Sequence, residues 1–443
     1  MSENTSGPLS TEPVRGVRDF LPRDHARFSY ILETMRATAE RFGFLEYSAS
    51  ILEPTELYTN KTSEEIVREQ TYTFLDRGER SLTLRPEMTP SVARLIAGHR
   101  REFPMPQKWY SIPACYRYER PQRGRLREFW QLNCDIFGAT GIYGDAEILL
   151  LAHGIMRAFG ATDEQFTIKI NHRGVLRELL NAVAREAQIE LAQEDHAALL
   201  RVMDRKDKLS TQEYAHAIAE VIGAERSEAL LAHHTDERIA KLLPTLPAFK
   251  EFTTLQQLME HLGLGNVKHD PSLVRGFDYY TGMVFEVFDT APENSRSIFG
   301  GGRYDNLTEL FGGEPVSGVG FGMGEPSIQN FLETHDLVPT YVSPTELFLV
   351  TIGPAARTHA FALAAELREA DVATSVNLID RSVGEQLKYA SSLDIPFALV
   401  IGEDEIASGT YPLKHLKSQS EQPVVRANIP DALFSFGMER EES

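Results

Sequence analysis

Residues Trp109–Phe137 read "WYSIPACYRYERPQRGRLREFWQLNCDIF". Two strand-like runs flank a basic loop, and this pattern predicts a hairpin within an antiparallel sheet. Side chains alternate between the two faces of a strand, so Gln131, Asn133 and Asp135 share one face of the returning strand. The residues between them are apolar. We therefore expect one face of the sheet to cover a core and the other to carry polar side chains.

The loop of this hairpin is rich in arginine. Guanidinium groups match phosphate oxygens with a forked geometry, and Arg117 and Glu119 share a strand face beside the loop. A polyphosphate site would explain these features. A solvated sheet face with a charged tip explains them equally well. The arginines of the loop are Arg120, Arg123, Arg125 and Arg127.

Two other segments place unusual residues where a ligand could approach. In "LTLRPEMTPS" (Leu82–Ser91) a strand runs into a helix, with Glu87 and Thr89 at the junction. Acidic residues and threonine also favour the first turn of a helix for structural reasons. In "GVGFGMG" (Gly318–Gly324) every second residue is glycine, which indicates close approach to one face of a strand. Packing against another backbone accounts for that pattern as well.

The totals of the chain bound its class. Lys and Arg number 45 against 64 Asp and Glu, a net charge of −19, which argues against non-specific nucleic-acid binding but permits a local basic patch. Two cysteines cannot form a disulfide framework or a zinc site. With no signal-peptide pattern and no apolar run near the ~18 residues of a membrane span, a cytoplasmic protein without membrane contact is expected.

Composition shifts along the 443 residues predict several domains. An Ala-, Glu- and Leu-rich stretch with helical spacing interrupts a strand-rich region, which indicates an inserted helical domain. After a proline-containing linker, strands and helices alternate, as in a small α/β domain with a mostly parallel sheet. The expected parts are a disordered tail (1–13), a core (14–174 and 262–335), a helical insertion (175–261), a linker (336–345) and a C-terminal α/β domain (346–443).

Several of these segments together resemble the class II aminoacyl-tRNA synthetases, and among them the histidyl-tRNA synthetase family. Tyr116–Gly138 resembles the second class motif, and "LTLRPEMT" resembles an amino-acid-binding segment. "LVRGFDYYTG" (Leu273–Gly282) is similar to the histidyl-specific motif, the most discriminating of the set, while Gly300–Leu307 and Ser317–Gly324 are similar to the start of the third class motif. Val376–Glu405 resembles an anticodon-binding domain. The fold implied is an α+β catalytic core with an antiparallel sheet, a helical insertion and a C-terminal α/β anticodon-binding domain.

The resemblance implies a role for each residue of a nucleotide site. Arg117 would hold the α-phosphate of ATP and the activated carboxylate, and Arg275 would stabilise the charge that develops there. Glu119 would read the adenine amino group, Phe129 would stack on the adenine, and Arg127 would be a further ATP contact.

It also implies a histidine pocket. Three residues would bind the α-amino end, and three would line the space around the imidazole, where Asp135 and Tyr280 hydrogen-bond the ring. Such a polar pocket rejects apolar amino acids because its buried groups would be left unpaired. The residues are, in this order, Glu87, Thr89, Gln131, Asp135, Tyr279 and Tyr280.

Three positions depart from the family pattern. Met88 stands where glycine is usual, and Asp135 stands where glutamate is more frequent. Ser327 stands where the family has an arginine that clamps the γ-phosphate of ATP. We hypothesise that another arginine compensates, with Arg303 and Arg123 as candidates, although either could be an ordinary sheet or surface residue.

The resemblance implies an enzyme that activates L-histidine with ATP, accompanied by Mg²⁺, and transfers it to tRNA(His). A homodimer is expected from the family. The alternative is a catalytically impaired regulatory paralog that serves histidine biosynthesis; the missing arginine at position 327 favours it, and the retained anticodon domain opposes it. Another class II synthetase or a simple tRNA-binding module fits the motifs less well. Basic residues that could contact tRNA, or be solvated surface groups, are Arg381, Lys388, Lys414 and Lys417.

Overall fold

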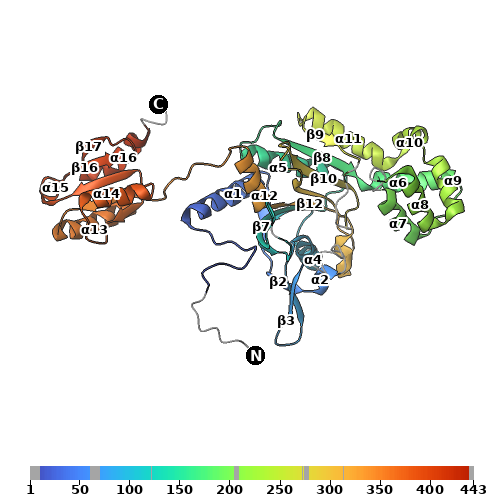
Figure 1. Cartoon of the computed structure of the whole chain (residues 1–443), viewed down its shortest axis with the longest axis horizontal. Coiled ribbons are helices and arrows are strands. Elements are labelled where there is room, and N and C mark those ends of the chain that lie inside the picture. The colour runs from blue at the N-terminus through green and yellow to red at the C-terminus, as the bar shows by residue number, and fades with distance from the viewer. Residues whose placement is uncertain are drawn as a thin grey trace. The chain divides into compact units, whose positions relative to one another are not determined.

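The computed structural model describes residues 10–59, 70–120, 122–203, 209–271, 273, 279–312 and 314–438. The chain divides into two compact units, Met1–Pro339 and Thr340–Ser443, which Figure 1 shows with their elements labelled. Most of the tail expected at 1–13 lies outside the described residues.

The first unit is built on a nine-stranded sheet with the order β1-β5-β7-β12-β11-β10-β8-β9, and β6 pairs with β7. The edge pairs β1–β5 and β8–β9 are parallel, and the pairs between them are antiparallel. The predicted antiparallel core is therefore confirmed. The strands are β1 (Leu45–Glu46), β5 (Gln107–Ser111), β6 (Ala114–Tyr116), β7 (Glu128–Phe137), β8 (Phe166–His172), β9 (Val267–His269), β10 (Met283–Asp289), β11 (Ser297–Arg303) and β12 (Gly318–Gly324).

Four helices cover the apolar face of this sheet. Leu132, Cys134 and Ile136 of β7 and Val319 and Phe321 of β12 all point into the core beneath these helices. The strand alternation predicted for the hairpin is thus the alternation that the sheet adopts. The helices are α1 (Pro22–Arg41), α5 (Ile142–Ala158), α11 (Pro247–His261) and α12 (Glu325–Thr334).

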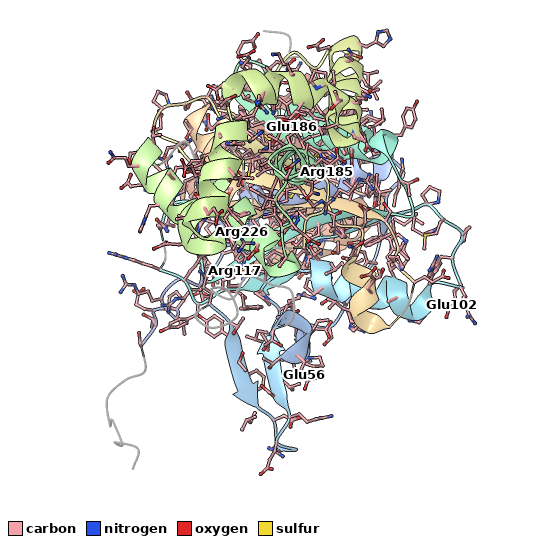
Figure 2. All side chains as sticks on the ribbon, turned by 90° about the vertical axis from the view of Figure 1, so that its right-hand side faces the viewer. Glu56, Glu102, Arg117, Arg185, Glu186 and Arg226 are labelled. Atoms are coloured by element: carbon pink, nitrogen blue, oxygen red, sulfur yellow. The ribbon has the colours of Figure 1, made fainter. Side chains whose placement is uncertain are left out.

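The opposite face of the sheet meets helix α4 (Thr89–His99). Val92 and Ile96 of this helix pack with Tyr280 and Tyr304 in a second apolar cluster. Next to α4, a hairpin projects from the body of the unit, with Glu56 labelled beside it in Figure 2. It belongs to a small sheet of order β2-β4-β3, made of β2 (Leu52–Pro54), β3 (Tyr72–Leu75) and β4 (Ser81–Leu84), with α2 (Glu56–Thr59) alongside.

The helical stretch between β8 and β9 has a core of its own, formed by residues such as Leu180, Tyr214 and Ile218. Its last helix differs, because Phe252 and Met259 of α11 pack into the core of the large sheet. Figure 1 shows α6 to α10 grouped beside that sheet. These helices are α6 (Arg173–Glu186), α7 (Gln193–Met203), α8 (Thr211–Ile222), α9 (Ala224–His233) and α10 (Asp236–Leu242).

The second unit has a five-stranded sheet of order β14-β13-β15-β16-β17. The pairs of β13 are parallel, whereas β15–β16 and β16–β17 are antiparallel. The expected mostly parallel sheet was therefore wrong in its second half, because the C-terminal strands form a hairpin. The elements are β13 (Leu347–Thr351), α13 (Pro354–Glu369), β14 (Thr374–Val376), α14 (Val383–Ser392), β15 (Phe397–Ile401), α15 (Glu403–Ser408), β16 (Thr410–His415), β17 (Glu421–Val425) and α16 (Ile429–Met438).

A buried ion pair joins the sheet to α5. Arg303, at the end of β11, lies 2.7 Å from Asp145 Oδ1 through its Nη2, and the two side chains are 7% and 3% exposed. Its guanidinium also donates to the carbonyl oxygens of Ala139 and Gly141 and to Ser317 Oγ. Burial raises the pKa of Asp145 to about 6, although Arg303 opposes that rise. The guanidinium of Arg303 is therefore bonded within the protein and has a structural role.

Replacing this arginine should destabilise the first unit. In Arg303→Met the Asp145 carboxylate would stay buried without its partner, which costs ~3–5 kcal/mol of unfolding free energy at pH 7.5. The loss should shrink at pH 5, where Asp145 takes up a proton. Urea denaturation of the first unit measures both. Arg80→Met is the matched control, because Arg80 is 77% exposed in its pair with Asp76, and it should not shift the transition. Equal effects of the two substitutions would contradict the stabilising role of the buried pair between Arg303 and Asp145.

Candidate active site

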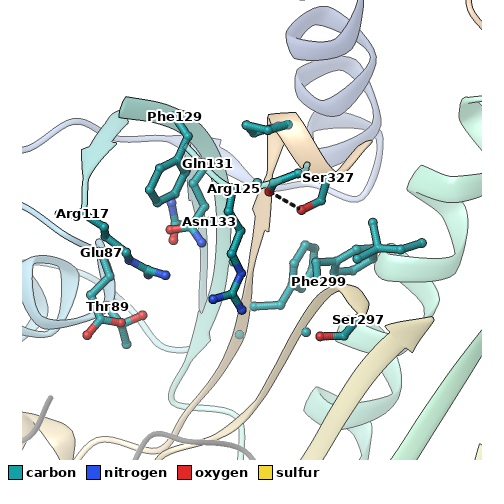
Figure 3. Close-up of a pocket in the computed structure, with 18 of the residues that line it drawn as sticks. Glu87, Thr89, Arg117, Arg125, Phe129, Gln131, Asn133, Ser297, Phe299 and Ser327 are labelled. Carbon is teal, nitrogen blue, oxygen red and sulfur yellow. Dashed lines mark hydrogen bonds between the residues drawn. The ribbon is translucent and has the colours of Figure 1, made fainter. Parts of the chain in front are cut away.

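A cleft with about 960 Å³ of empty space lies on the polar face of the large sheet. The end of the loop before β7, the polar residues of β7, the glycines of β12 and the start of α4 all contribute to its walls. Figure 3 shows the side chains of Arg117 and Arg125 extending into this space, with Phe129 on one side and Ser327 on the other. The predicted site residues that line it are Glu87, Thr89, Arg117, Glu119, Phe129, Gln131, Tyr279 and Tyr280.

The cleft exists because glycines of β12 lie opposite polar residues of β7. In the antiparallel register Gly320 pairs with Asp135 and Gly322 pairs with Asn133. A Cβ on Gly320 would lie 2.3 Å from Asp135 Oδ1, and one on Gly322 would lie 2.5 Å from Gln131 Nε2. Neighbouring side chains thus occupy the space that the glycines leave, which answers the question raised by their alternation.

A buried carboxylic acid, Asp135, lies beneath the cleft, where it contacts the lining residues Tyr304 and Gly320 without lining the cleft itself. Asp135 is 2% exposed and accepts a hydrogen bond at Oδ1 from the Tyr304 hydroxyl. Its Oδ2 is buried and has no hydrogen-bond partner among the described residues. Burial raises the pKa of Asp135 to about 7, with the Tyr304 hydrogen bond opposing the rise. Asp135 therefore keeps one unpaired acceptor next to residues of the cleft wall.

A second carboxylate lies where strand β4 gives way to α4. Glu87 is buried, and its Oε2 accepts a hydrogen bond of 3.3 Å from the Tyr279 hydroxyl. Arg117 lies nearby, since its Nε donates to the Pro86 carbonyl oxygen at 3.0 Å. A carboxylate, a phenol and the Gln131 amide at one wall suit a small polar ligand with an ammonium group.

The other end of the cleft combines arginines with an aromatic ring, and Arg117 lies where the two ends meet. The guanidinium carbon of Arg117 lies 5.3 Å from the centre of the Phe129 ring. Arg125 pairs with Glu119 Oε2 at 3.1 Å, and Ser327 Oγ donates to the carbonyl oxygen of Gly124 at 3.4 Å. Two guanidinium groups beside a ring that lines the cleft suit a nucleotide, whose phosphates and base need these two kinds of partner.

Two predicted site residues, Arg127 and Asp135, are not among the residues that line the cleft. Arg127 Nε donates to the Glu119 carbonyl oxygen, and its guanidinium covers the Tyr118 ring at 4.0 Å. Arg125 lines the cleft instead, because the loop turns through a left-handed conformation at Gly124, where φ is +73°. Arg275 falls outside the described residues.

The lining residues that were not predicted as ligands include Asn133, Tyr304 and Arg125. Asn133 and Arg125 stood in the patterns that pointed to the site, one on the polar strand face and one in the basic loop. Tyr304 follows the glycines of β11 in sequence, and no spacing rule connects it to Asp135. Its role depends on the pairing of β11 with β12, which the sequence alone does not specify.

No group of three or more potential metal-binding side chains occurs among the described residues. A metal ion at this site would therefore depend on oxygens supplied by a ligand, as Mg²⁺ commonly does with phosphates. Within the described ranges, no helix is both long and apolar enough to cross a membrane.

Comparisons with known proteins agree along the whole chain. The family model described as histidyl-tRNA synthetase matches residues 16–325, and the one described as anticodon binding domain matches residues 346–434. The Histidine–tRNA ligase of Leptospira biflexa is 40% identical over 419 residues, 93% of this chain and 95% of that protein. That of Haloarcula marismortui is 35% identical over 438 residues, 95% and 97% of the two chains. The crystal structure of apo S. aureus histidyl-tRNA synthetase is 26% identical, with a TM-score of 0.74 over 97% of this chain and 99% of that one.

The buried carboxyl group of Asp135 predicts a specific pH dependence of stability. The pKa of Asp135 in the folded protein, about 7, lies above its ordinary value of 3.8. Between these values the folded state holds a proton that the unfolded state has lost, so the free energy of unfolding falls as the pH rises from 4 to 7. The substitution Asp135→Asn removes this pH dependence of the free energy of unfolding.

Urea denaturation of both proteins at pH 4.5 and pH 8 measures the effect. We expect Asp135→Asn to be more stable than the parent at pH 8 by at least about 1 kcal/mol, the equivalent of about one pKa unit, and similar to it at pH 4.5. Parallel pH profiles of the two proteins would contradict a raised pKa at Asp135.

Proposed function

The chain belongs to the histidyl-tRNA synthetase family, and from that premise we propose that it activates L-histidine with ATP as histidyl-adenylate before transferring the histidyl group to the 3′ end of tRNA(His). It is a class II aminoacyl-tRNA ligase, with an anticodon-binding domain at its C-terminal end. The observation that carries the proposal is one cleft with two chemically different ends. Buried carboxylates and phenols form one end, and arginines with an aromatic ring form the other.

Histidine binds at the carboxylate end in this proposal. Glu87, Thr89 and Gln131 hold the α-ammonium group, where the charge of Glu87 complements that of the ligand. Asp135 and Tyr280 hydrogen-bond the imidazole. Support comes from the unpartnered Oδ2 of Asp135, which gains a donor when the ring N–H arrives. A protonated Asp135 could in turn donate to an unprotonated ring nitrogen, so either tautomer of the imidazole can be read.

Tyr279 has a positioning role in the same pocket. Its hydroxyl donates to Glu87, and its ring lies 4.8 Å from the ring of Tyr280, centre to centre. The pair therefore connects the group that holds the α-ammonium end to the group that reads the imidazole. Buried polar groups of this kind discriminate strongly against apolar side chains, which would leave them unpaired.

ATP binds at the arginine end. Phe129 stacks on the adenine, Glu119 accepts a hydrogen bond from its amino group, and Arg117 holds the α-phosphate. Glu119 is paired with Arg125 in this structure, so Arg125 has to move when adenine takes its place. Mg²⁺ arrives with the nucleotide and neutralises phosphate charge.

The chemistry is a displacement at phosphorus. A carboxylate oxygen of histidine attacks the α-phosphorus, the bond to the bridging oxygen breaks, and pyrophosphate leaves. Arg117 and Arg275 stabilise the negative charge that builds up on the α-phosphate oxygens. The cleft otherwise acts by holding both substrates in line, and no covalent bond to the enzyme is needed.

The remaining parts serve tRNA in this proposal. The second unit contacts the anticodon, where Lys388 and Lys414 line one small cavity and the guanidinium of Arg381 lies 4.6 Å from the centre of the Tyr389 ring. Basic groups next to an aromatic ring suit single-stranded nucleic acid. The helical insertion lies over the acceptor arm, and two copies of the chain associate as a homodimer.

Ser327 favours a second candidate function, that of a regulatory paralog without synthetase activity. An arginine that the family places at this position is absent, although the anticodon-binding domain and the tyrosine pair are both present. The two candidate functions differ in whether the cleft catalyses the activation of histidine.

Histidine-dependent exchange of pyrophosphate into ATP separates the candidates. We expect exchange with L-histidine and Mg·ATP, and charging of histidine tRNA in a second assay. Exchange with a different amino acid would refute the proposed specificity, and no exchange with any amino acid would favour the regulatory function.

Glu87→Gln should raise the KM for histidine and leave the KM for ATP unchanged. The substitution keeps the shape of the side chain but removes the charge that pairs with the α-ammonium group, a loss of about 1.5–3 kcal/mol or roughly 10- to 150-fold. Pyrophosphate exchange measures both constants. Glu102→Gln, at a 64% exposed side chain, is the control and should change neither. A larger effect on ATP than on histidine would contradict the placement of Glu87.

A further inference from the structure

A second cavity lies beside the nucleotide end of the cleft. It has about 910 Å³ of empty space, part of it open to solvent, and shares part of its wall with the first cavity. Residues common to both show that the two cavities adjoin one another. The shared residues are Gly124, Arg125, Ser297, Ile298 and Ser327.

Two arginines outside the first cavity line the second. Arg123 comes from the basic loop, and its guanidinium reaches Thr334 Oγ1 at 3.4 Å, a long hydrogen bond. Arg296 comes from the opposite wall, immediately before β11, and is exposed. Arg296 forms no hydrogen bond or ion pair with another described residue. Both cations can therefore turn toward an anion at little cost.

Two acidic residues also line this cavity, and they differ in their partners. The carboxylate of Asp289 already has partners in the protein: it lies 2.7 Å from His335 Nε2 and accepts hydrogen bonds from Asn294 Nδ2 and from the backbone N–H of Ala291. Glu293 is exposed to solvent, so water screens its charge. The cavity is therefore more favourable to an anion than a count of charges suggests.

Position 327 lies on the wall that the two cavities share. Ser327 Oγ donates to the carbonyl oxygen of Gly124, and a Cβ on Gly124 would lie 3.9 Å from both Cα and Oγ of Ser327, so the basic loop rests directly on the first turn of α12. A long side chain at 327 would displace this loop. The serine that departs from the family pattern thus lets the loop that carries Arg123 lie against α12.

We propose that the second cavity receives the β- and γ-phosphates of ATP, with Arg296 and Arg123 as the groups that bind them on opposite walls. The inference rests on the proposed function, because it assigns the tail of the same ATP molecule. It replaces the hypothesis that Arg303 compensates for Ser327, since Arg303 is enclosed in its pair with Asp145. Pyrophosphate then leaves through this cavity after the bond to the α-phosphate breaks.

The proposal separates the binding of ATP from that of AMP. Arg296→Ala and Arg123→Ala should each raise the dissociation constant of Mg·ATP about tenfold, the loss expected for a charge-assisted hydrogen bond, and more when combined. AMP has no β- or γ-phosphate, so its dissociation constant should stay within twofold of the parent value. Calorimetric titration of the full chain measures both ligands.

Control variants test whether the second cavity favours an anion. Arg77→Ala removes an exposed arginine that lines neither cavity and should change neither constant. Glu293→Gln should leave ATP binding unchanged or tighten it. If it weakens ATP binding instead, the cavity serves a cation and the assignment is wrong. Unchanged ATP binding in the double variant Arg123→Ala/Arg296→Ala would also overturn it.

Ser327→Arg tests the contact between the basic loop and α12. Because the new side chain would push the loop away from α12, ATP binding should weaken at least fivefold while AMP binding changes less. Tighter ATP binding in this variant would show that position 327 itself is the clamp site and would refute the relocated one. If the parent protein binds no ATP, the proposed function fails, which is a different outcome from failure of the arginine variants alone.

Discussion

The antiparallel register between β7 and β12 is the constraint on which the site depends. It sets a glycine of β12 against each of the polar residues Asp135, Asn133 and Gln131 of β7. Any side chain at Gly320 would meet the carboxylate of Asp135 or the backbone of β7. A slip by one residue would turn the apolar residues of β12 toward the cleft and the glycines toward the core. The same pairing therefore closes the core and opens the cleft.

This strand pairing determines what lies on each of the two faces of the sheet. On the apolar face, helices α1, α5, α11 and α12 bury the alternate residues of the same strands. On the polar face, burial raises the pKa of Asp135 beneath the cleft. Arg117, next to Glu87, and Arg125 extend into the cleft from separate segments (Figure 3). Two chemically distinct substrates can thus be held in one cleft.

Much of this was predictable from the sequence because it follows from short-range patterns. The period of two in β7 predicted the two faces of the sheet, and helical spacing predicted the helices that lie between β8 and β9. Contacts between distant segments were not predictable in this way. The Tyr304 hydrogen bond to Asp135, the burial of Arg303 against Asp145, and the choice of Arg125 over Arg127 all depend on how strands and loops come together. The antiparallel half of the second sheet was missed for the same reason, since strand direction is set by tertiary pairing.

A crystal structure of the full chain with L-histidine and a non-hydrolysable ATP analogue tests the central claim most directly. The account predicts that the imidazole lies on the polar face of β7 and β12, within hydrogen-bond distance of Asp135 or Tyr280, and that the α-phosphate contacts Arg117. Histidine bound elsewhere, or a cleft in which the glycines of β12 face away from both ligands, would contradict it.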